Sequence, residues 1–283
     1  MPFAYHGGQR PRLYKAVAAG AELDYPGAVA PAPAHVDLWP ERALIISKLG
    51  EVRRHRHACA ALLVGLDGDF ELRWPRGCVR TRAAFIPAGF EHALDCGDTL
   101  MVTLYTFALT GETEALAATL GCSSRGLAVD LQLPAGLGAW LRGVYDAPLD
   151  PEATASRLRA RLLAGGSDAS VGVDARVRAL VERVRAAPEA SASLASLASE
   201  LELSPTRLMH LLKAELAVPW RGFRRWERMR VLAAHVGAGE SLTTAGLAAG
   251  FYDSAHLCRG FRSAFGVPPS RVLHGGSRIR ATG

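Results

Sequence analysis

The stretch that decides the fold is residues 242–268, LTTAGLAAGFYDSAHLCRGFRSAFGVP. Residues 194–219, LASLASELELSPTRLMHLLKAELAVP, repeat its apolar pattern with an offset of 48 residues before the central turn and 49 after it. In both copies apolar residues recur near every third or fourth position, which predicts a short helix, a turn and a second helix. Ser204 and Asp253 stand where the second helices begin, and both residue types cap helix starts well. The sequence therefore predicts two helix-turn-helix motifs, joined by a basic helix over residues 220–236.

The basic residues are concentrated in the part of the chain that holds this repeat. Residues 166–283 contain 16 basic and 10 acidic side chains, whereas residues 1–165 contain 17 of each, so the whole net charge of +6 lies in the second part. Between them residues 164–170, AGGSDAS, have the composition of a linker. A basic helical part with two such motifs indicates double-stranded DNA as a partner.

The composition excludes several classes of protein. Hydrophobic residues make up 49% and charged residues 21% of the 283 residues, which excludes wholesale disorder and a coiled-coil rod. Five scattered cysteines are too few for a disulfide framework. The apolar stretch at residues 16–21 is too short for a signal-peptide core, and no later stretch approaches the ~18 apolar residues of a membrane span. We therefore expect a cytoplasmic protein with no membrane partner.

The second helix of each motif is expected to have one buried and one outward face. A leucine at every fourth position from Leu208 to Leu216 forms the buried stripe of the first helix, and the repeat offset transfers the outward face to the second. We predict that the DNA-contacting residues are Thr206, Met209, His210, Lys213, Ala255, His256, Arg259 and Arg262. Arg259 can donate two hydrogen bonds to guanine, whereas Lys213 and Arg262, one turn further along, are placed for phosphates.

Residues 248–262, AAGFYDSAHLCRGFR, followed by FGVPPS at 265–270, resemble the signature around the second motif of AraC/XylS-type transcription regulators. The resemblance covers about residues 174–273. It implies a DNA-binding unit that inserts two recognition helices into successive segments of the major groove.

The sequence of the first part of the chain predicts short strands followed by helices. The expected strands cover residues 43–49, 59–66, 70–74, 83–86 and 100–107, and the expected helices cover residues 112–120, 137–145 and 151–163. Asp67-Gly68, between two of the strands, is a signal for a tight hairpin. Several short strands at this spacing favour a sandwich or a barrel.

Two short histidine motifs lie among these strands. His55-Arg56-His57 and, thirty residues on, PAGFEH ending at His92 resemble the two cupin motifs, whose three histidines bind a metal inside a β-barrel. Sensor domains of this kind also occur in the AraC/XylS family, so the resemblance implies an effector-binding domain. The cupin glutamate expected four or five residues after His57 is replaced by Ala61 or Leu62.

Strand alternation offers other ligands in place of that glutamate. His55, His57 and Cys59 would share one strand face, as would His92 and Cys96, and a mixture of imidazole and thiolate favours zinc or a softer transition metal. The alternative is an organic-ligand pocket lined by residues such as Leu63 and Phe85, with the histidines as remnants of the fold and the cysteines as small core residues.

Together these observations predict an α+β protein in three parts. A cupin-like β-barrel with flanking helices (residues 1–165) binds the effector and forms a homodimer through the helices of residues 112–163. A linker (166–173) leads to an all-α DNA-binding domain (174–283) with two helix-turn-helix motifs and a linker helix between them. The expected function is transcription regulation at promoter DNA, with RNA polymerase as a further partner if the protein is an activator, and without catalysis. The alternative is a metal-dependent cupin enzyme, which would leave the paired motifs unexplained.

Overall fold

A computed structural model describes residues 32–107, 110–163, 173–187, 193–216, 218–274 and 276–282. Residues 31–283 form one compact unit. Within the described ranges no helix is both long and apolar enough to cross a membrane. The predicted linker, residues 166–173, lies outside the described residues except for Val173.

The strands form two separate sheets. Seven strands are ordered β10-β7-β4-β9-β2-β1-β11, and four are ordered β3-β8-β5-β6. The strands are β1 (His35–Leu38), β2 (Arg42–Lys48), β3 (Glu51–Arg56), β4 (Ala60–Gly65), β5 (Phe70–Trp74), β6 (Gly77–Thr81), β7 (Ala83–Ile86), β8 (Glu91–Asp95), β9 (Leu100–Thr106), β10 (Ala128–Val129) and β11 (Arg278–Ala281). The five strands expected from the sequence are all present. The sheets do not close into one hydrogen-bonded ring, so the cupin-like barrel is not confirmed.

The predicted hairpin at Asp67-Gly68 is wrong. Strand β4 pairs with β7 and β9, whereas β5 pairs with β6 and β8, so this turn carries the chain from one sheet to the other. Asp67 accepts a hydrogen bond from the Leu100 amide (2.8 Å) and one from Arg142 (2.9 Å). Asp67 and Gly68 do lie in a bend between β4 and β5, but these two strands pair with other strands and not with each other.

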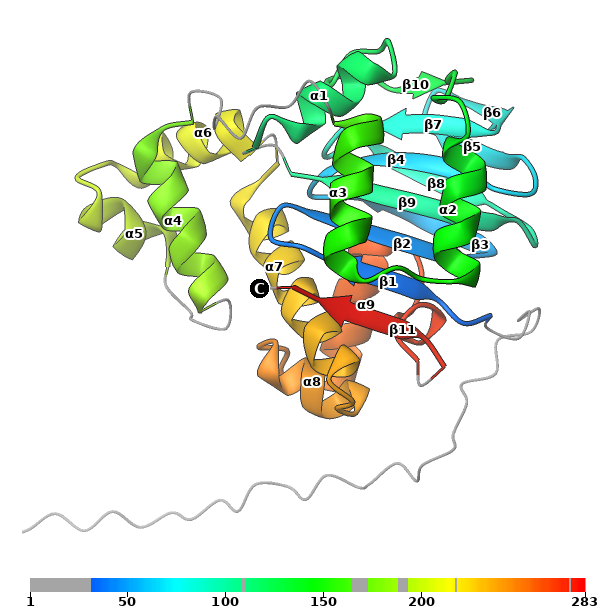
Figure 1. The fold of residues 1–283 in the computed structure, drawn as a ribbon. Helices are drawn as coiled ribbons and strands as arrows, with labels where there is room; N and C mark the ends of the chain where they lie inside the picture. The colour runs from blue at the N-terminus through cyan, green and yellow to red at the C-terminus, as the bar shows by residue number, and fades with distance from the viewer. Residues whose placement is uncertain are drawn as a thin grey trace, which may run out of the picture. The chain divides into compact units, whose positions relative to one another are not determined.

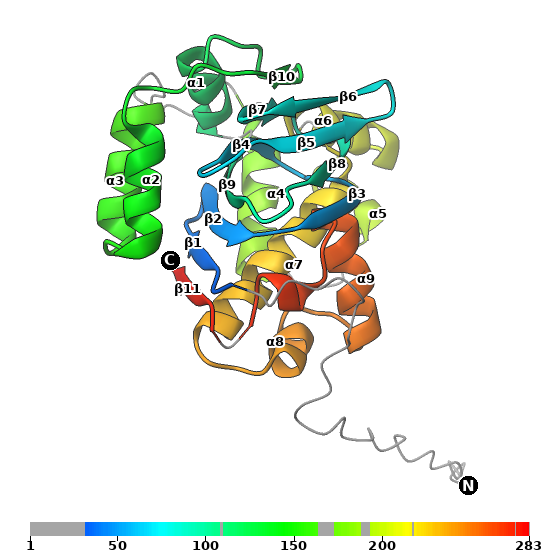
Figure 2. The same ribbon diagram turned by 90° about the vertical axis from the view of Figure 1, so that its right-hand side faces the viewer.

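Three helices cover one face of the seven-stranded sheet, namely α1 (Glu112–Thr119), α2 (Leu137–Asp146) and α3 (Pro151–Leu162). Figure 1 shows α2 and α3 across this face, and Figure 2 shows the same layer from the side. Because side chains alternate along a strand, β4 contributes to two packed clusters. Ala60, Leu62 and Val64 pack with Leu141 of α2 and Leu158 of α3, among other residues. Ala61 and Leu63 lie in the other cluster, which also contains residues of the four-stranded sheet.

The second half of the chain contains both expected motifs. Its helices are α4 (Ala175–Ala186), α5 (Leu194–Glu200), α6 (Pro205–Leu216), α7 (Trp220–Gly237), α8 (Leu242–Ala248) and α9 (Ser254–Phe265), followed by the 3-10 turn η2 (Pro269–Arg271). Helices α5 and α6 form the first motif, α8 and α9 form the second, and α7 joins them. Ser204 and Asp253 cap α6 and α9 as predicted, by accepting hydrogen bonds from the amides of Arg207 and His256.

The second half is not all-α. Strand β11 pairs in parallel with β1 and completes the edge of the seven-stranded sheet. Arg280 on β11 donates to both carboxylate oxygens of Asp37 (2.7 and 2.8 Å), a residue with no exposed surface. A strand this short is hard to predict because its pairing partner lies more than 240 residues away.

Helix α9 ends against strand β3. The Arg53 amide donates a hydrogen bond to the Gly266 carbonyl (3.0 Å), and Gly266 has a left-handed backbone with φ of +74°. A Cβ at this position would lie 2.4 Å from the Arg53 carbonyl oxygen and 2.8 Å from His55 Nδ1. Glycine is therefore required both by the backbone angle and by the close approach of the strand.

We predict that Gly266→Ala lowers the free energy of unfolding by about 3 kcal/mol, because left-handed strain and the collision with β3 add together. Gly97→Ala is the matched control, since Gly97 also has a positive φ (+50°) but has no atom within 4 Å of the place that a methyl group would occupy. The control should lose only about 1 kcal/mol. Urea unfolding measures both values. Equal losses would show that α9 and β3 do not keep this contact in solution.

Candidate functional site

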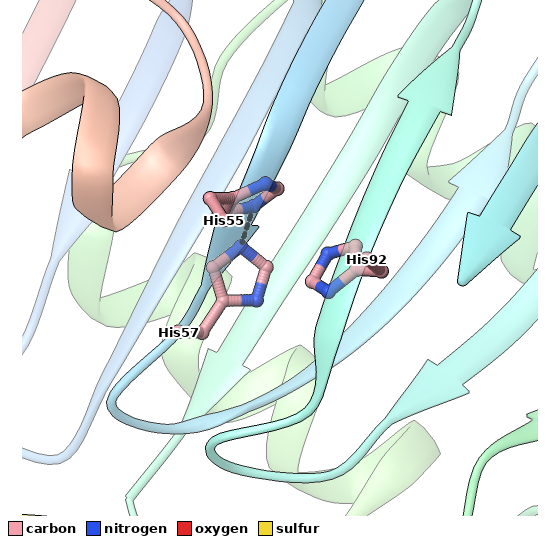
Figure 3. Close-up of side chains that lie close together, drawn as sticks. All are labelled: His55, His57 and His92. Carbon is pink, nitrogen blue, oxygen red and sulfur yellow. Dashed lines mark hydrogen bonds between the residues drawn. The ribbon is translucent and has the colours of Figure 1, made fainter. Parts of the chain in front are cut away.

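Three histidines come together where β3 and β8 pair. His55 on β3 is registered opposite His92 on β8, and His57 follows directly after β3. Each is at most 5% exposed. One ligand nitrogen from each ring lies within 4.8 Å of the others, and Figure 3 shows the three rings facing one another. The structure thus brings together the three metal ligands proposed from the sequence.

Backbone carbonyls orient two of these rings. His55 Nδ1 lies 2.8 Å from the Arg53 carbonyl and His92 Nδ1 lies 3.0 Å from the Phe90 carbonyl; a carbonyl only accepts, so both nitrogens must donate. In neutral imidazole the Nε2 atoms of both rings then carry lone pairs that can accept hydrogen bonds. His57 Nε2 donates to His55 Nε2 at 2.7 Å, which leaves His57 Nδ1 as an acceptor. His57 Nδ1 and His92 Nε2 are buried without any hydrogen-bond partner in the described structure.

Burial keeps the cluster uncharged. It lowers the pKa of His55 to about 3 and that of His92 to about 4. Burial and the neighbouring histidines hold the pKa of His57 well below its ordinary value. All three rings are neutral near pH 7, which is the form of imidazole that binds metals.

Tyr105 on β9 is a member of the cluster that sequence reasoning missed. Its hydroxyl lies 3.3 Å from His57 Nε2, and its ring packs edge-on against the His57 ring at 4.9 Å. Ala61, one of the two positions considered for the cupin glutamate, is registered opposite Tyr105 on the neighbouring strand. The only sequence signal was the tyrosine's place in a strand that otherwise reads as core.

Neither cysteine joins the histidines. The chain bends at residues 58–59, so strand alternation does not extend to Cys59, which instead lines a recess with Tyr105, Trp226 and Arg230. Cys96 follows β8 directly and lies four residues from His92, about 13 Å along an extended chain. Among the described residues, the group of close ligand atoms contains histidines alone.

The two residues suggested for an organic pocket lie apart. Leu63 belongs to the cluster that includes the four-stranded sheet, whereas Phe85 packs beneath the helices of the opposite face. They therefore do not line one cavity. A cavity of about 480 Å³ lies elsewhere, where His55 and His57 meet helices α7 and α9. Its walls include Arg221, Arg225 and Trp226 of α7.

Aromatic rings link the histidine cluster to the helical second half of the chain. Tyr105 packs against Trp226 of α7 at 5.1 Å and Phe265 of α9 at 6.1 Å, and those two rings lie 5.7 Å from each other. Both α7, which joins the two motifs, and α9 are thus in contact with Tyr105, the residue that touches His57.

The predicted DNA-reading residues lie on two helices. The structure leaves Thr206, Met209, His210, Lys213, Ala255 and Arg259 exposed, and His256 and Arg262 partly exposed. His256 also has a local role, because its Nδ1 accepts a hydrogen bond from the Tyr252 amide at 3.2 Å and its ring packs on Phe251. Tyr252, in the turn between α8 and α9 and 85% exposed, is a further candidate that the apolar pattern did not single out.

Comparison with known proteins agrees with this architecture. A helix-turn-helix domain family matches residues 197–275. The bifunctional transcriptional activator/DNA repair enzyme Ada of Escherichia coli is 32% identical over 91 residues; the match covers 32% of this chain and 26% of Ada. The chain thus spans about a quarter of that relative's length.

Solved structures of ToxT from Vibrio cholerae resemble the whole described fold. A 1.65 Å structure covers 81% of this chain and 97% of ToxT, with a TM-score of 0.52 and 13% identity. The match to a ToxT structure with a bound unsaturated fatty acid covers 84% of this chain and 97% of that chain, with a TM-score of 0.51 and 11% identity. At this identity the likeness shows a shared fold. Residues 197–275 thus hold a helix-turn-helix domain, as the sequence predicted, and the chain is similar to part of a transcriptional activator in sequence and to ToxT in fold.

Proposed function

We propose that this chain is a transcription regulator of the AraC family that binds promoter DNA sequence-specifically, and that a transition metal ion held by His55, His57 and His92 controls its DNA affinity. The observation that supports this most directly is the cluster of three buried neutral imidazoles, with two nitrogens lacking hydrogen-bond partners. Buried polar atoms are rarely left unpaired unless a ligand or a function accounts for them.

The residues present fit a metal. Nitrogen donors suit zinc, copper, nickel and iron, and the carbonyl bonds to His55 and His92 resemble the outer contacts that orient metal-binding histidines. When bound, the ion would supply positive charge and a cross-link between β3 and β8. Tyr105 lies close enough to the histidines to respond to such a change.

The contacts of the histidine cluster support a structural coupling between effector binding and DNA binding. Gly266, at the end of α9, lies against His55, and Tyr105 joins His57 to Trp226 of α7 and Phe265 of α9. A shift of the histidine rings would therefore change the packing beneath the second recognition helix. Regulation requires such a differential effect on two states of the protein.

An acidic small molecule is the alternative effector. The cavity of about 480 Å³ beside His55 and His57 has an apolar wall at Val218 and arginines at Arg221 and Arg225, which suits a carboxylate with an apolar tail. ToxT, which shares the fold, has been solved with an unsaturated fatty acid bound. The metal-dependent enzyme considered from the sequence would give no role to the paired helix-turn-helix motifs.

The metal proposal predicts that purified protein carries close to one equivalent of a transition metal. His57→Ala should reduce the metal content below about a tenth of an equivalent. The control His235→Ala, which changes a histidine in the last turn of α7, should leave the metal content unchanged. Elemental analysis measures the content. DNA affinity, measured on an operator selected from a random library, should change at least about fivefold when a chelator removes the metal. DNA binding that ignores the chelator but responds to fatty acids would support the acidic effector instead.

Arg259→Ala should weaken binding to the operator by about 1–3 kcal/mol and relax the preference at one base pair, because an exposed guanidinium on this helix can donate two hydrogen bonds to guanine. Lys213→Ala should weaken operator and random DNA by similar factors and reduce the salt dependence. Both variants are titrated on both DNAs at several salt concentrations. Equal weakening of the two DNAs by Arg259→Ala would reassign that residue to a phosphate.

We also propose a homodimer that uses helices α1 to α3. Two linked reading units on one operator gain affinity through their high effective concentration. Sedimentation velocity at micromolar protein should show twice the 30.1 kDa chain mass. A monomer both with and without operator DNA would contradict the proposal.

A further inference from the structure

A cleft of about 430 Å³ lies between helices α7 and α9, on the side away from their buried faces. Arg221, Arg224, Arg225 and Arg228 form its α7 wall. Their spacing of three, four and seven residues places all four on one stripe of the helix, about 10 Å long. His256, Arg259, Gly260 and Ser263 have the same spacing and form the α9 wall.

The cleft is strongly basic. No aspartate or glutamate is among the described residues that line it. The one acidic residue of α7, Glu227, is buried on another face, where Arg230 donates to it at 3.0 Å and Arg185 of α4 lies 3.5 Å away. Arg225 is held in the cleft by a hydrogen bond to Ser263 (2.8 Å). Helix α7 thus carries the ion pair of Glu227 and Arg230 on one face, and its row of four arginines on the face toward α9.

The connectivity indicates what this row faces. Helix α7 joins the two motifs, and two recognition helices that read successive major-groove segments have a stretch of sugar-phosphate backbone between them. Arg259, the predicted base-reading residue, borders the same cleft, so the row lies on the DNA side of the second motif. We propose that the arginine row of α7 binds the phosphates between the two major-groove segments. This inference rests on the proposed function and adds residues that were not predicted to contact DNA.

The shape of the cleft favours a polymer backbone over a small anion. Arg221 at one end and Arg259 on the facing wall are exposed, so the row is open to solvent along its side. Phosphates follow one another at a rise of about 3.4 Å along each strand, so ~10 Å of arginines matches two or three of them. A row of point charges contributes affinity without sequence preference.

The test uses the full chain with Arg224→Gln and Arg228→Gln combined. These two arginines line the α7–α9 cleft, whereas Arg221 and Arg225 also line the cavity beside the histidines. Operator and random DNA should be weakened by the same factor. The slope of log affinity against log salt should become shallower by about 1.8, because two phosphate contacts are lost. The variant with lysine at both positions keeps the charge and should keep the slope, which separates charge from any structural effect.

Arg76→Gln with Arg80→Gln is the matched control, because it removes two exposed positive charges from the sensor half. It should leave the slope unchanged. An unchanged slope in the Arg224/Arg228 variant, weakening confined to the operator, or a loss only of the effector response would each overturn this inference while the DNA-binding function stands. A wild-type protein without affinity for DNA at low salt would overturn both.

Discussion

The Arg53 amide donates a hydrogen bond to the Gly266 carbonyl, and this bond holds the end of the second recognition helix against the strand that carries His55. The approach is so close that any side chain at position 266 would collide with the strand. The strand-rich first half and the second motif therefore share packed surface at the place where the histidines gather. Because of this packing, the strand that carries His55 also supports the end of α9.

A second contact between the two halves of the chain is made by strand β11. Strand β11 extends the seven-stranded sheet, and Arg280 pairs with the fully buried Asp37. Burial by itself raises the pKa of Asp37, but hydrogen bonds from His35 and Arg280 outweigh that effect and hold it below the usual range. A buried carboxylate without its partner would be costly, so the pair fixes β11 in place.

Helix α4, which precedes the first motif, is held by ion pairs. Arg185 of α4 reaches Glu41 before β2 (3.1 Å) and lies 3.5 Å from Glu227 of α7. Burial raises the pKa of Glu227, and the neighbouring Arg230 and Arg185 oppose that rise. These contacts depend on charge and do not pass through the histidine cluster. A ligand at the cluster would therefore act most directly on the second motif and on α7, through Gly266 and the ring of Tyr105.

Local pattern alone determined most of the elements and the two motifs. Apolar spacing located α1 to α3, both helix-turn-helix units and five strands, because helix and strand periods are properties of neighbouring residues. The grouping of His55 and His57 with His92 followed only from the resemblance to the two cupin motifs, because no local spacing relates the two segments. Tertiary structure alone decided which strands pair, so the Asp67-Gly68 turn links two sheets and β11 joins a strand at the other end of the chain. It also placed Tyr105 beside His57 and moved Cys59 away, because contacts across strands and through a bend in the backbone are not encoded in the spacing of nearby residues.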